Sequence, residues 1–196
     1  LYLDLKNGAA AEKELRRAME LGAEPAAWSL NLAEAMVLQG KFSDALDHLD
    51  QTTVLGAQEE SRAMSLRGQA SMGMKQLEDA KRFFEQAAQI DPGNQDAGLG
   101  TIMLMLAEKK FDQAKAATDQ YLAKFPENVD GLLIRGELHR KDGELTEASE
   151  RLGRAMELDP RDIRPVLAHA TTMIAVDDVE KAKADLDRAD KIQKDL

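Results

Sequence analysis

The feature that most constrains this chain is a period of about 34 residues that runs along almost its whole length. Proline recurs at this interval in the middle of the sequence, and alanine recurs at it throughout, with a single step of 35. A fixed period of this length in a helical pattern is typical of stacked helical hairpins, each burying its apolar face against its neighbours. The recurring residues are Pro92, Pro126 and Pro160, and Ala11, Ala45, Ala80, Ala114, Ala148 and Ala182.

The segment 129–162 shows the repeating design most clearly. It predicts a helix, a tight turn at Asp142-Gly143, a second helix, and a stop at Asp159-Pro160. The residues that set this pattern are Leu132, Gly136, Gly143, Leu145, Ala148, Leu152, Ala155 and Pro160, at positions 4, 8, 15, 17, 20, 24, 27 and 32 counted from Val129. The pattern resembles the tetratricopeptide repeat, which implies an all-α fold, a right-handed α-solenoid of helix-turn-helix repeats.

The same frame divides the whole chain. It predicts a single array with a partial repeat at 1–25 and five full repeats at 26–60, 61–94, 95–128, 129–162 and 163–196. The chain begins in mid-pattern, so we interpret it as part of a longer protein.

Two repeats depart from the regular pattern. In 26–60, the run Thr52-Thr53-Val54 is β-branched and unfavourable for a helix, so we expect the second helix to end early or distort. In 95–128, Thr118 and Tyr121 stand at positions 24 and 27, where the usual order is a large residue and then a small one. We expect the Tyr121 ring to fill the space that Thr118 leaves, and a functional tyrosine is the alternative.

Composition narrows the classes of partner. The chain has 26 basic and 36 acidic residues, a net charge of −10, and no cysteine. Because phosphate contacts need unpaired Lys or Arg, this balance disfavours nucleic acid and anionic membranes as partners. The most apolar run, Gly98 to Ala107, is about half the ~20 residues that a membrane-spanning helix needs, so direct membrane insertion is not expected.

The residues that could carry chemistry predict neither catalysis nor a cofactor. His139 and His169 fall at packing positions of neighbouring repeats, and no third ligand suggests a metal site. Serines such as Ser29, Ser65 and Ser149 lie within predicted helices without a plausible His-Asp relay, and no glycine-rich phosphate loop is present. We therefore expect structural histidines, no metal, no cofactor and no enzymatic activity.

The resemblance also implies where a partner would bind. In this family, positions 2, 5, 9 and 12 of each first helix point into a concave groove. The predicted peptide-binding groove comprises Leu30, Glu34, Arg62, Gln69, Met72, Leu99, Met103, Leu106, Leu133, Glu137, Arg140 and Leu167. The basic clamp with which some relatives hold a chaperone's C-terminal carboxylate is absent, because the positions that would need polar or basic residues hold Leu30, Leu66, Gly100 and Ile134. The apolar residues Leu99, Met103 and Leu106 favour an extended or helical peptide segment, and burial of this patch within the array is the alternative.

Within the family, the segments AAAEKELRRAMELGAEP and LNLAEAMVLQGKFSDALDHL resemble the repeat proteins of bacterial exosortase (PEP-CTERM) systems. That resemblance implies a scaffold in the bacterial envelope or periplasm that binds a protein or peptide partner. A cytoplasmic location is the alternative. Two other functions stay open. The chain could be a self-association module forming a homo-oligomer, or the recruiting arm of a larger enzyme.

Overall fold

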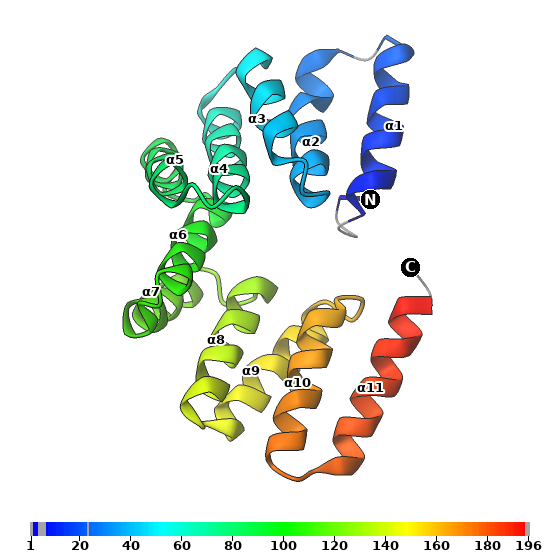
Figure 1. The fold of residues 1–196 in the computed structure, drawn as a ribbon, viewed down its shortest axis with the longest axis vertical. Helices are drawn as coiled ribbons and strands as arrows, with labels where there is room; N and C mark the ends of the chain where they lie inside the picture. The colour runs from blue at the N-terminus through cyan, green and yellow to red at the C-terminus, as the bar shows by residue number, and fades with distance from the viewer. Residues whose placement is uncertain (1, 4–6, 23, 195–196) are drawn as a thin grey trace. The chain divides into compact units, whose positions relative to one another are not determined.

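The structure, a computed structural model, describes residues 2–3, 7–22 and 24–194. These residues form eleven α-helices and divide into a first unit, residues 1–108, and a second unit, residues 109–196 (Figure 1). The helices are α1 (Gly8–Glu20), α2 (Pro25–Leu38), α3 (Phe42–Gln51), α4 (Ala57–Gly73), α5 (Leu77–Ile90), α6 (Gln95–Ala107), α7 (Phe111–Lys124), α8 (Val129–Asp142), α9 (Leu145–Leu158), α10 (Ile163–Ala175) and α11 (Val179–Lys194). The all-α solenoid fold expected from the period is confirmed.

The first helices of the later hairpins begin at capping residues that recur with the period. The side chains of Asn94, Asn128 and Asp162 accept hydrogen bonds from backbone N–H groups in the first turns of α6, α8 and α10, at 2.8–2.9 Å. Each cap satisfies a donor that a helix start would otherwise leave without a partner. The caps thus fix where the inner helix of each hairpin begins.

Left-handed residues also recur with the period, at the tip of each hairpin. Gly40, Lys75, Lys109, Gly143 and Asp177 have φ values of 73°, 63°, 62°, 81° and 61°. Two of these positions carry the expected glycine, whereas the others hold a side chain in a conformation that costs about 1 kcal/mol or more. At Lys75, Lys109 and Asp177, helix packing therefore imposes a left-handed turn that the local sequence disfavours.

The core is built on the periodic alanines and on large residues packed against glycine. Ala45, Ala80, Ala114 and Ala148 are fully buried. Phe84 of α5 is also fully buried, and a Cβ added to Gly68 or Gly100 would lie 2.6 or 2.3 Å from its ring. The absence of a side chain on α4 and α6 is what lets both helices close over this ring.

The irregular first full repeat behaves as expected at its second helix. α3 has 10 residues where α5, α7 and α9 have 14, and Thr52 follows it with an extended backbone. The predicted early end is confirmed. α4, however, begins at Ala57 rather than at Ser61, because Gly56 (φ 98°) reverses the chain and Glu59 and Glu60 favour a helix start.

The interchange of large and small residues on α7 is also confirmed. Thr118 and Tyr121 are 0% and 7% exposed. A Cβ on Gly131 of α8 would lie 3.0 Å from the Tyr121 ring, which also packs against Phe125 with centroids 5.0 Å apart. The tyrosine ring therefore fills the space between α7 and α8.

Candidate functional site

The first helices of successive hairpins lie beside one another within each unit: α2, α4 and α6 in the first, α8 and α10 in the second. Ion pairs link neighbouring inner helices. Arg62 of α4 contacts Glu34 of α2 at 2.6 Å, and Arg164 of α10 contacts Asp130 of α8 at 2.7 Å. Two polar residues of the predicted groove, Glu34 and Arg62, thus satisfy each other.

Two leucines of the predicted groove are buried, so the expectation that they face solvent is wrong. Leu30 and Leu99 are 6% and 9% exposed. Leu30 packs in one cluster with Leu49 and with Ala63 and Leu66 of α4. Leu30 is therefore covered by α4, the first helix of the next repeat, and it contributes to the core rather than to an open surface.

The remaining predicted residues of the first unit are open or half-buried. Met103 of α6 is 44% exposed, and Leu106, Gln69 and Met72 are half-buried. Met72 also packs against the cluster that contains Phe84. We call the surface formed by Gln69, Met72, Met103, Leu106 and the Glu34–Arg62 pair the inner surface of the first unit.

In the second unit, the predicted residues do not form one uniform set. Glu137 and Arg140 of α8 are half-buried and pair with each other at 2.6 Å, and Leu133 is half-buried. Leu167 of α10, at the same repeat position as the buried Leu30, is 43% exposed.

Ser149, His169 and Asp185 come together, which corrects the expectation that no relay is present. The oxygen of Ser149 lies 2.9 Å from His169 Nε2, and His169 Nδ1 lies 2.6 Å from Asp185 Oδ2. No local sequence motif marks this contact, because the three residues come from α9, α10 and α11. The two contacts therefore link α9 to α10 and α10 to α11.

The surroundings of this trio favour a structural role over nucleophilic catalysis. Acyl transfer needs N–H donors aimed at a developing oxyanion beside the nucleophile. Ser149 lies inside α9, where backbone N–H groups bond within the helix, and the neighbouring N–H of Ala148 donates to the carbonyl of Glu144 at 3.0 Å. The helix therefore uses the backbone N–H groups around Ser149, so they are not free to serve as oxyanion donors.

The other two histidines also have local partners. His48 Nε2 lies 3.0 Å from the carbonyl oxygen of Ser29, and its ring stacks on Trp28. His139 Nδ1 lies 2.6 Å from a carboxylate oxygen of Glu144. Among the residues that the structure describes, no group of three or more His, Cys, Asp or Glu side chains could hold a metal ion.

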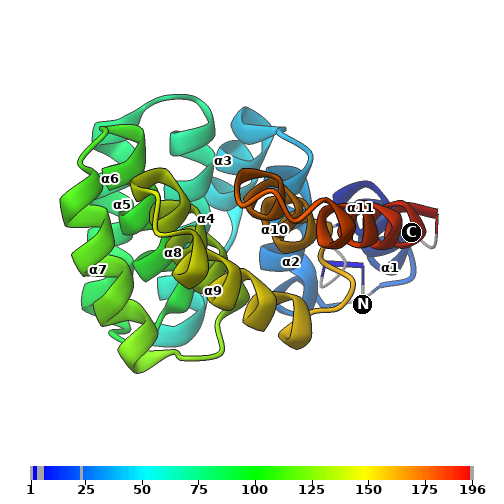
Figure 2. The same cartoon turned by 90° about the horizontal axis from the view of Figure 1, so that it is seen from below.

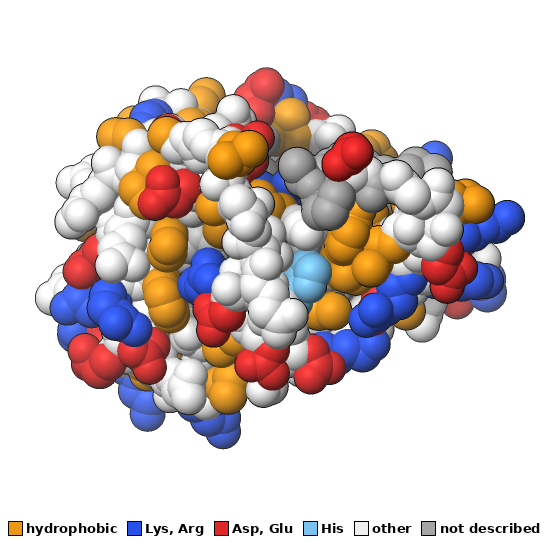
Figure 3. Space-filling model, turned by 90° about the horizontal axis from the view of Figure 1, so that it is seen from above, with side chains coloured by type: hydrophobic (Ala, Val, Ile, Leu, Met, Phe, Trp, Pro, Cys, Tyr) orange, Lys and Arg blue, Asp and Glu red, His pale blue; other side chains and the backbone are white. Residues whose placement is uncertain are grey.

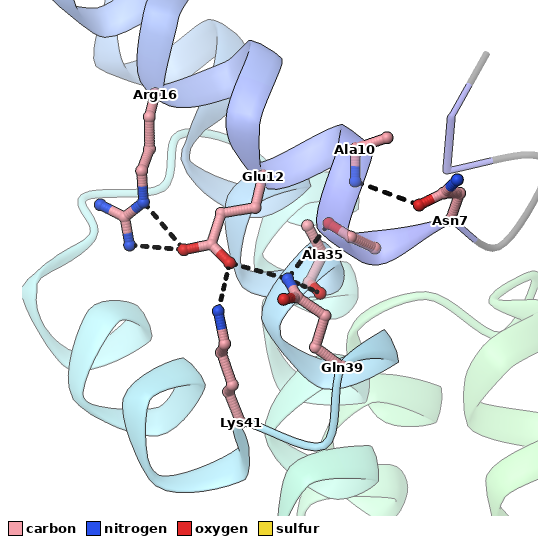
Figure 4. A network of polar contacts seen from close by, with 8 residues as sticks. Asn7, Ala10, Glu12, Arg16, Ala35, Gln39 and Lys41 are labelled. Atoms are coloured by element: carbon pink, nitrogen blue, oxygen red, sulfur yellow. Dashed lines mark hydrogen bonds and ion pairs between the residues drawn. The ribbon is translucent and has the colours of Figure 1, made fainter.

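A charged cluster fixes α1 against the next hairpin (Figure 4). The carboxylate of Glu12 accepts hydrogen bonds from Lys41 Nζ at 2.7 Å, Gln39 Nε2 at 2.7 Å and Arg16 Nε at 2.8 Å. The bonds from Lys41 and then Gln39 lower the pKa of Glu12 to about 2 from 4.5, against the opposing effect of burial. Because the charged groups of the cluster bond to one another, we interpret the cluster as a structural contact that holds α1 against α2 and α3.

Surface charge is mixed rather than segregated on the face shown in Figure 3. Blue Lys and Arg side chains lie among red Asp and Glu side chains, with hydrophobic groups between them. Such a surface lacks the basic field expected of a polyanion-binding face. No helix in the described part of the chain is long and apolar enough to cross a membrane.

Family models match two stretches of the chain. Both are described as tetratricopeptide repeat, and they match residues 1–53 and 71–134, together more than half of the sequence. The chain is a tetratricopeptide-repeat protein. No curated protein matches this tetratricopeptide-repeat chain in sequence.

Solved structures share the tetratricopeptide-repeat fold. The APC/C hetero-tetramer Cut9-Hcn1 matches with a TM-score of 0.78 at 16% identity, over 98% of this chain and 37% of that one. MamA from Desulfovibrio magneticus RS-1 matches with a TM-score of 0.59 at 17% identity, over 89% and 98% of the two chains. YrrB, described as a TPR protein with an unusual peptide-binding site, matches with a TM-score of 0.55 at 21% identity, over 94% and 95%. At these identities the likeness shows the fold alone.

Membership in this family supports a scaffold for protein–protein interaction, and the comparisons indicate no enzymatic family. The tetratricopeptide frame correctly located the first helices as neighbours. It missed the coverage of Leu30 by α4, which would have been found by asking which residues of that repeat face the next one.

Proposed function

We propose that this tetratricopeptide-repeat protein is a non-catalytic scaffold that binds a peptide or protein segment on the inner surface of the first unit. The observation that carries the proposal is the 44% exposure of Met103 on α6, a helix that is apolar on nearly every side. A large apolar side chain left open on an otherwise packed helix costs hydration free energy that a partner would recover.

The chemistry around Met103 suits an adaptable apolar contact with polar edges. Leu106 and Met72 supply further apolar surface, and methionine side chains adjust their shape to different ligands. Gln69 and the Glu34–Arg62 pair supply hydrogen-bonding groups beside them. An extended or helical peptide with one or two large apolar side chains fits this arrangement.

A finer proposal follows from the resemblance to exosortase-associated repeat proteins: the bound segment belongs to a protein of bacterial envelope or exopolysaccharide assembly. The rival functions are self-association and recruitment for an enzyme encoded in the same protein. Light scattering over a range of concentrations distinguishes self-association from a monomeric scaffold. A monomeric scaffold keeps the same molecular mass at every concentration, whereas a self-associating chain gains mass as the concentration rises.

The proposed surface can be tested with a peptide-display library selected on the full chain. Peptides that bind are then measured by fluorescence anisotropy against Met103→Ser and against Met74→Ser. Met74 is a matched control, because it is a methionine with 40% exposure outside the inner surface. Since Met103 is already partly buried, covering the rest contributes about 1 kcal/mol, so Met103→Ser is expected to weaken binding by about fivefold.

The control variant is expected to bind as tightly as the unmodified chain. Equal weakening by both substitutions, or weakening by neither, would place the binding site away from α6. Covalent attachment of a bound peptide to the Ser149 hydroxyl would instead contradict the non-catalytic assignment.

A further inference from the structure

The connector between α3 and α4 differs from the connectors at the same place in the later repeats. Before α6, α8 and α10 the chain makes a short turn, and the N–H groups of Asn94, Asn128 and Asp162 donate to the carbonyl oxygen three residues earlier, at 3.0, 3.1 and 3.2 Å. Residues 52–55, in contrast, belong to no helix or turn, and they lead through Gly56 into α4. We call residues 52–56 the open connector.

The open connector has the features of a strand that pairs with nothing. Thr52 has an extended backbone, with φ −84° and ψ 122°. Within the described part of the chain, the N–H groups of Thr53, Val54 and Leu55 donate to no other backbone group. The side chains alternate: Val54 is half-buried and packs against the cluster that contains Leu49, whereas Thr53 and Leu55 are exposed, Leu55 by 76%. This alternation is that of a β-strand, whose backbone groups are available to a partner.

The exposed stretch continues into the first turn of α4. This helix begins at Ala57, whereas the repeat frame and the starts of α6, α8 and α10 would place its beginning at Ser61. The additional turn, residues 57–60, is exposed at every residue, and Gly56 has no side chain with which to cap it. Burial resumes at Ser61, whose hydroxyl donates to the carbonyl oxygen of Ala87 at 2.8 Å and accepts from Asn94 at 2.7 Å. Because an uncapped helix end opens at low cost, residues 53–60 can extend while Ser61 stays fixed.

We propose that the open connector is a proteolytic processing site, cut between Leu55 and Gly56 by an endopeptidase whose primary pocket accepts leucine. Such an enzyme holds its substrate as an extended strand, through the backbone N–H and C=O groups, and the side chain before the cut enters the primary pocket. The segment 53–55 has this backbone already, and Leu55 projects into solvent. Water adds across the amide bond and leaves a carboxylate on Leu55 and an ammonium group on Gly56, so the step needs no other reactant.

Exposure of a large apolar side chain does not by itself make such a site. Leu21 is 80% exposed and Met74 is 40% exposed. The N–H groups of both residues donate to carbonyl oxygens of the preceding helical turn, at 3.2 and 3.0 Å. A protease would first have to unwind these helix ends, because it cuts in proportion to the population of the open form. Leu55 combines an exposed side chain with an extended backbone, and this combination selects it.

The two pieces should stay together after the cut. α2 and α3 lie beside α4, as Figures 1 and 2 show. The cluster that joins Leu30 and Leu49 to Leu66 spans the cut, and Arg67 of α4 pairs with Asp50 of α3 at 2.8 Å. Processing is therefore expected to convert the protein into a two-chain form without releasing its first helices.

The test uses chymotrypsin, which accepts leucine and methionine, on the folded full chain, with the masses of the products followed over time. The first internal cut is expected to give the pieces 1–55 and 56–196. Leu55→Glu is expected to slow this cut by about tenfold or more, because an apolar pocket disfavours a buried charge. Leu21→Glu is the matched control and should leave the rate unchanged. Both leucines are exposed, so neither variant should shift the melting curve measured by circular dichroism.

A first internal cut after Leu21 or Met74 would overturn the proposal, and so would equal slowing by the two variants. A chain that resists chymotrypsin until it is unfolded would also overturn it. Size-exclusion chromatography of the cut chain tests the two-chain form, since both pieces should elute together under native conditions and their separation would contradict that form. Neither variant alters Met103, so the outcome is independent of peptide binding on the inner surface.

Discussion

Replacing Gly100 with alanine should destabilise the first unit although alanine is the better helix former. Gly100 lies in α6 against the ring of Phe84, which is fully buried. On helix propensity alone, glycine to alanine inside a helix would stabilise by about 1 kcal/mol. The steric surroundings reverse the sign.

The magnitude follows from the space available. A Cβ on Gly100 would lie 2.3 Å from two carbons of the Phe84 ring, whereas carbon atoms in contact are normally about 3.5–4.0 Å apart. The ring cannot move away freely, because it is fully buried and also lies close to Gly68 of α4, where an added Cβ would be 2.6 Å from it. Overpacking typically costs about 1–3 kcal/mol, and an overlap at 2.3 Å belongs in the upper part of that range, about 2–3 kcal/mol. After the propensity gain of about 1 kcal/mol is subtracted, the net expected loss is about 1–2 kcal/mol.

Gly153 provides the matched control. It lies inside α9, and a Cβ there would meet no atom within 4 Å. Gly153→Ala should therefore show the propensity gain alone, about 0.5–1 kcal/mol. Urea unfolding followed by circular dichroism measures both variants. The single tryptophan, Trp28 of α2, reports the first unit by fluorescence, and its transition should shift only in Gly100→Ala.

A second substitution separates steric overlap from any other effect of Gly100→Ala. Phe84→Leu shortens the side chain at the point of overlap, so Gly100→Ala should cost less in the Phe84→Leu background than in the unmodified chain. Gly100→Ala at least as stable as the unmodified chain would refute the packing of Phe84 between α4 and α6.

Three other substitutions test separate features. The depressed pKa of Glu12 contributes stability that is present above about pH 4.5 and lost as the pH falls toward 2, so Glu12→Gln should cost about 1–2 kcal/mol at pH 7 and much less at pH 3 in urea unfolding. Lys109→Gly should raise the melting temperature by a degree or two, about 0.5 kcal/mol, because it removes a side chain from a left-handed backbone (φ 62°), and a lower melting temperature would contradict this. Ser149→Ala should cost about 1 kcal/mol by leaving His169 one partner short, and a fluorophosphonate probe should not label Ser149 in the unmodified chain.

Most of the fold could be predicted because one period carries it. Ala80, Ala114 and Ala148 stand where two helices must cross closely, and all three are fully buried. The β-branched run after α3 likewise predicted its early end, since that effect is local to the backbone. Periodic signals can be recognised in a single sequence because the same residue types recur at the same position of each repeat.

The contacts that the sequence did not predict depend on residues from several helices. Ser149, His169 and Asp185 meet only because α9, α10 and α11 stack in a particular register. The left-handed turn at Lys75 has no glycine to mark it, and it follows from the closure of the α4–α5 hairpin. Such features arise from tertiary packing that overrides local preference.

The candidate site also shows that residue identity alone does not predict contacts between repeats. Leu30 and Leu167 are the same residue type at the same repeat position, and the groove prediction treated them alike. One is 6% exposed and the other 43% exposed, because α4 covers the first and no helix of the described residues covers the second. The identity of a residue sets what it would gain from burial, but only the neighbouring repeat decides whether it is core or surface.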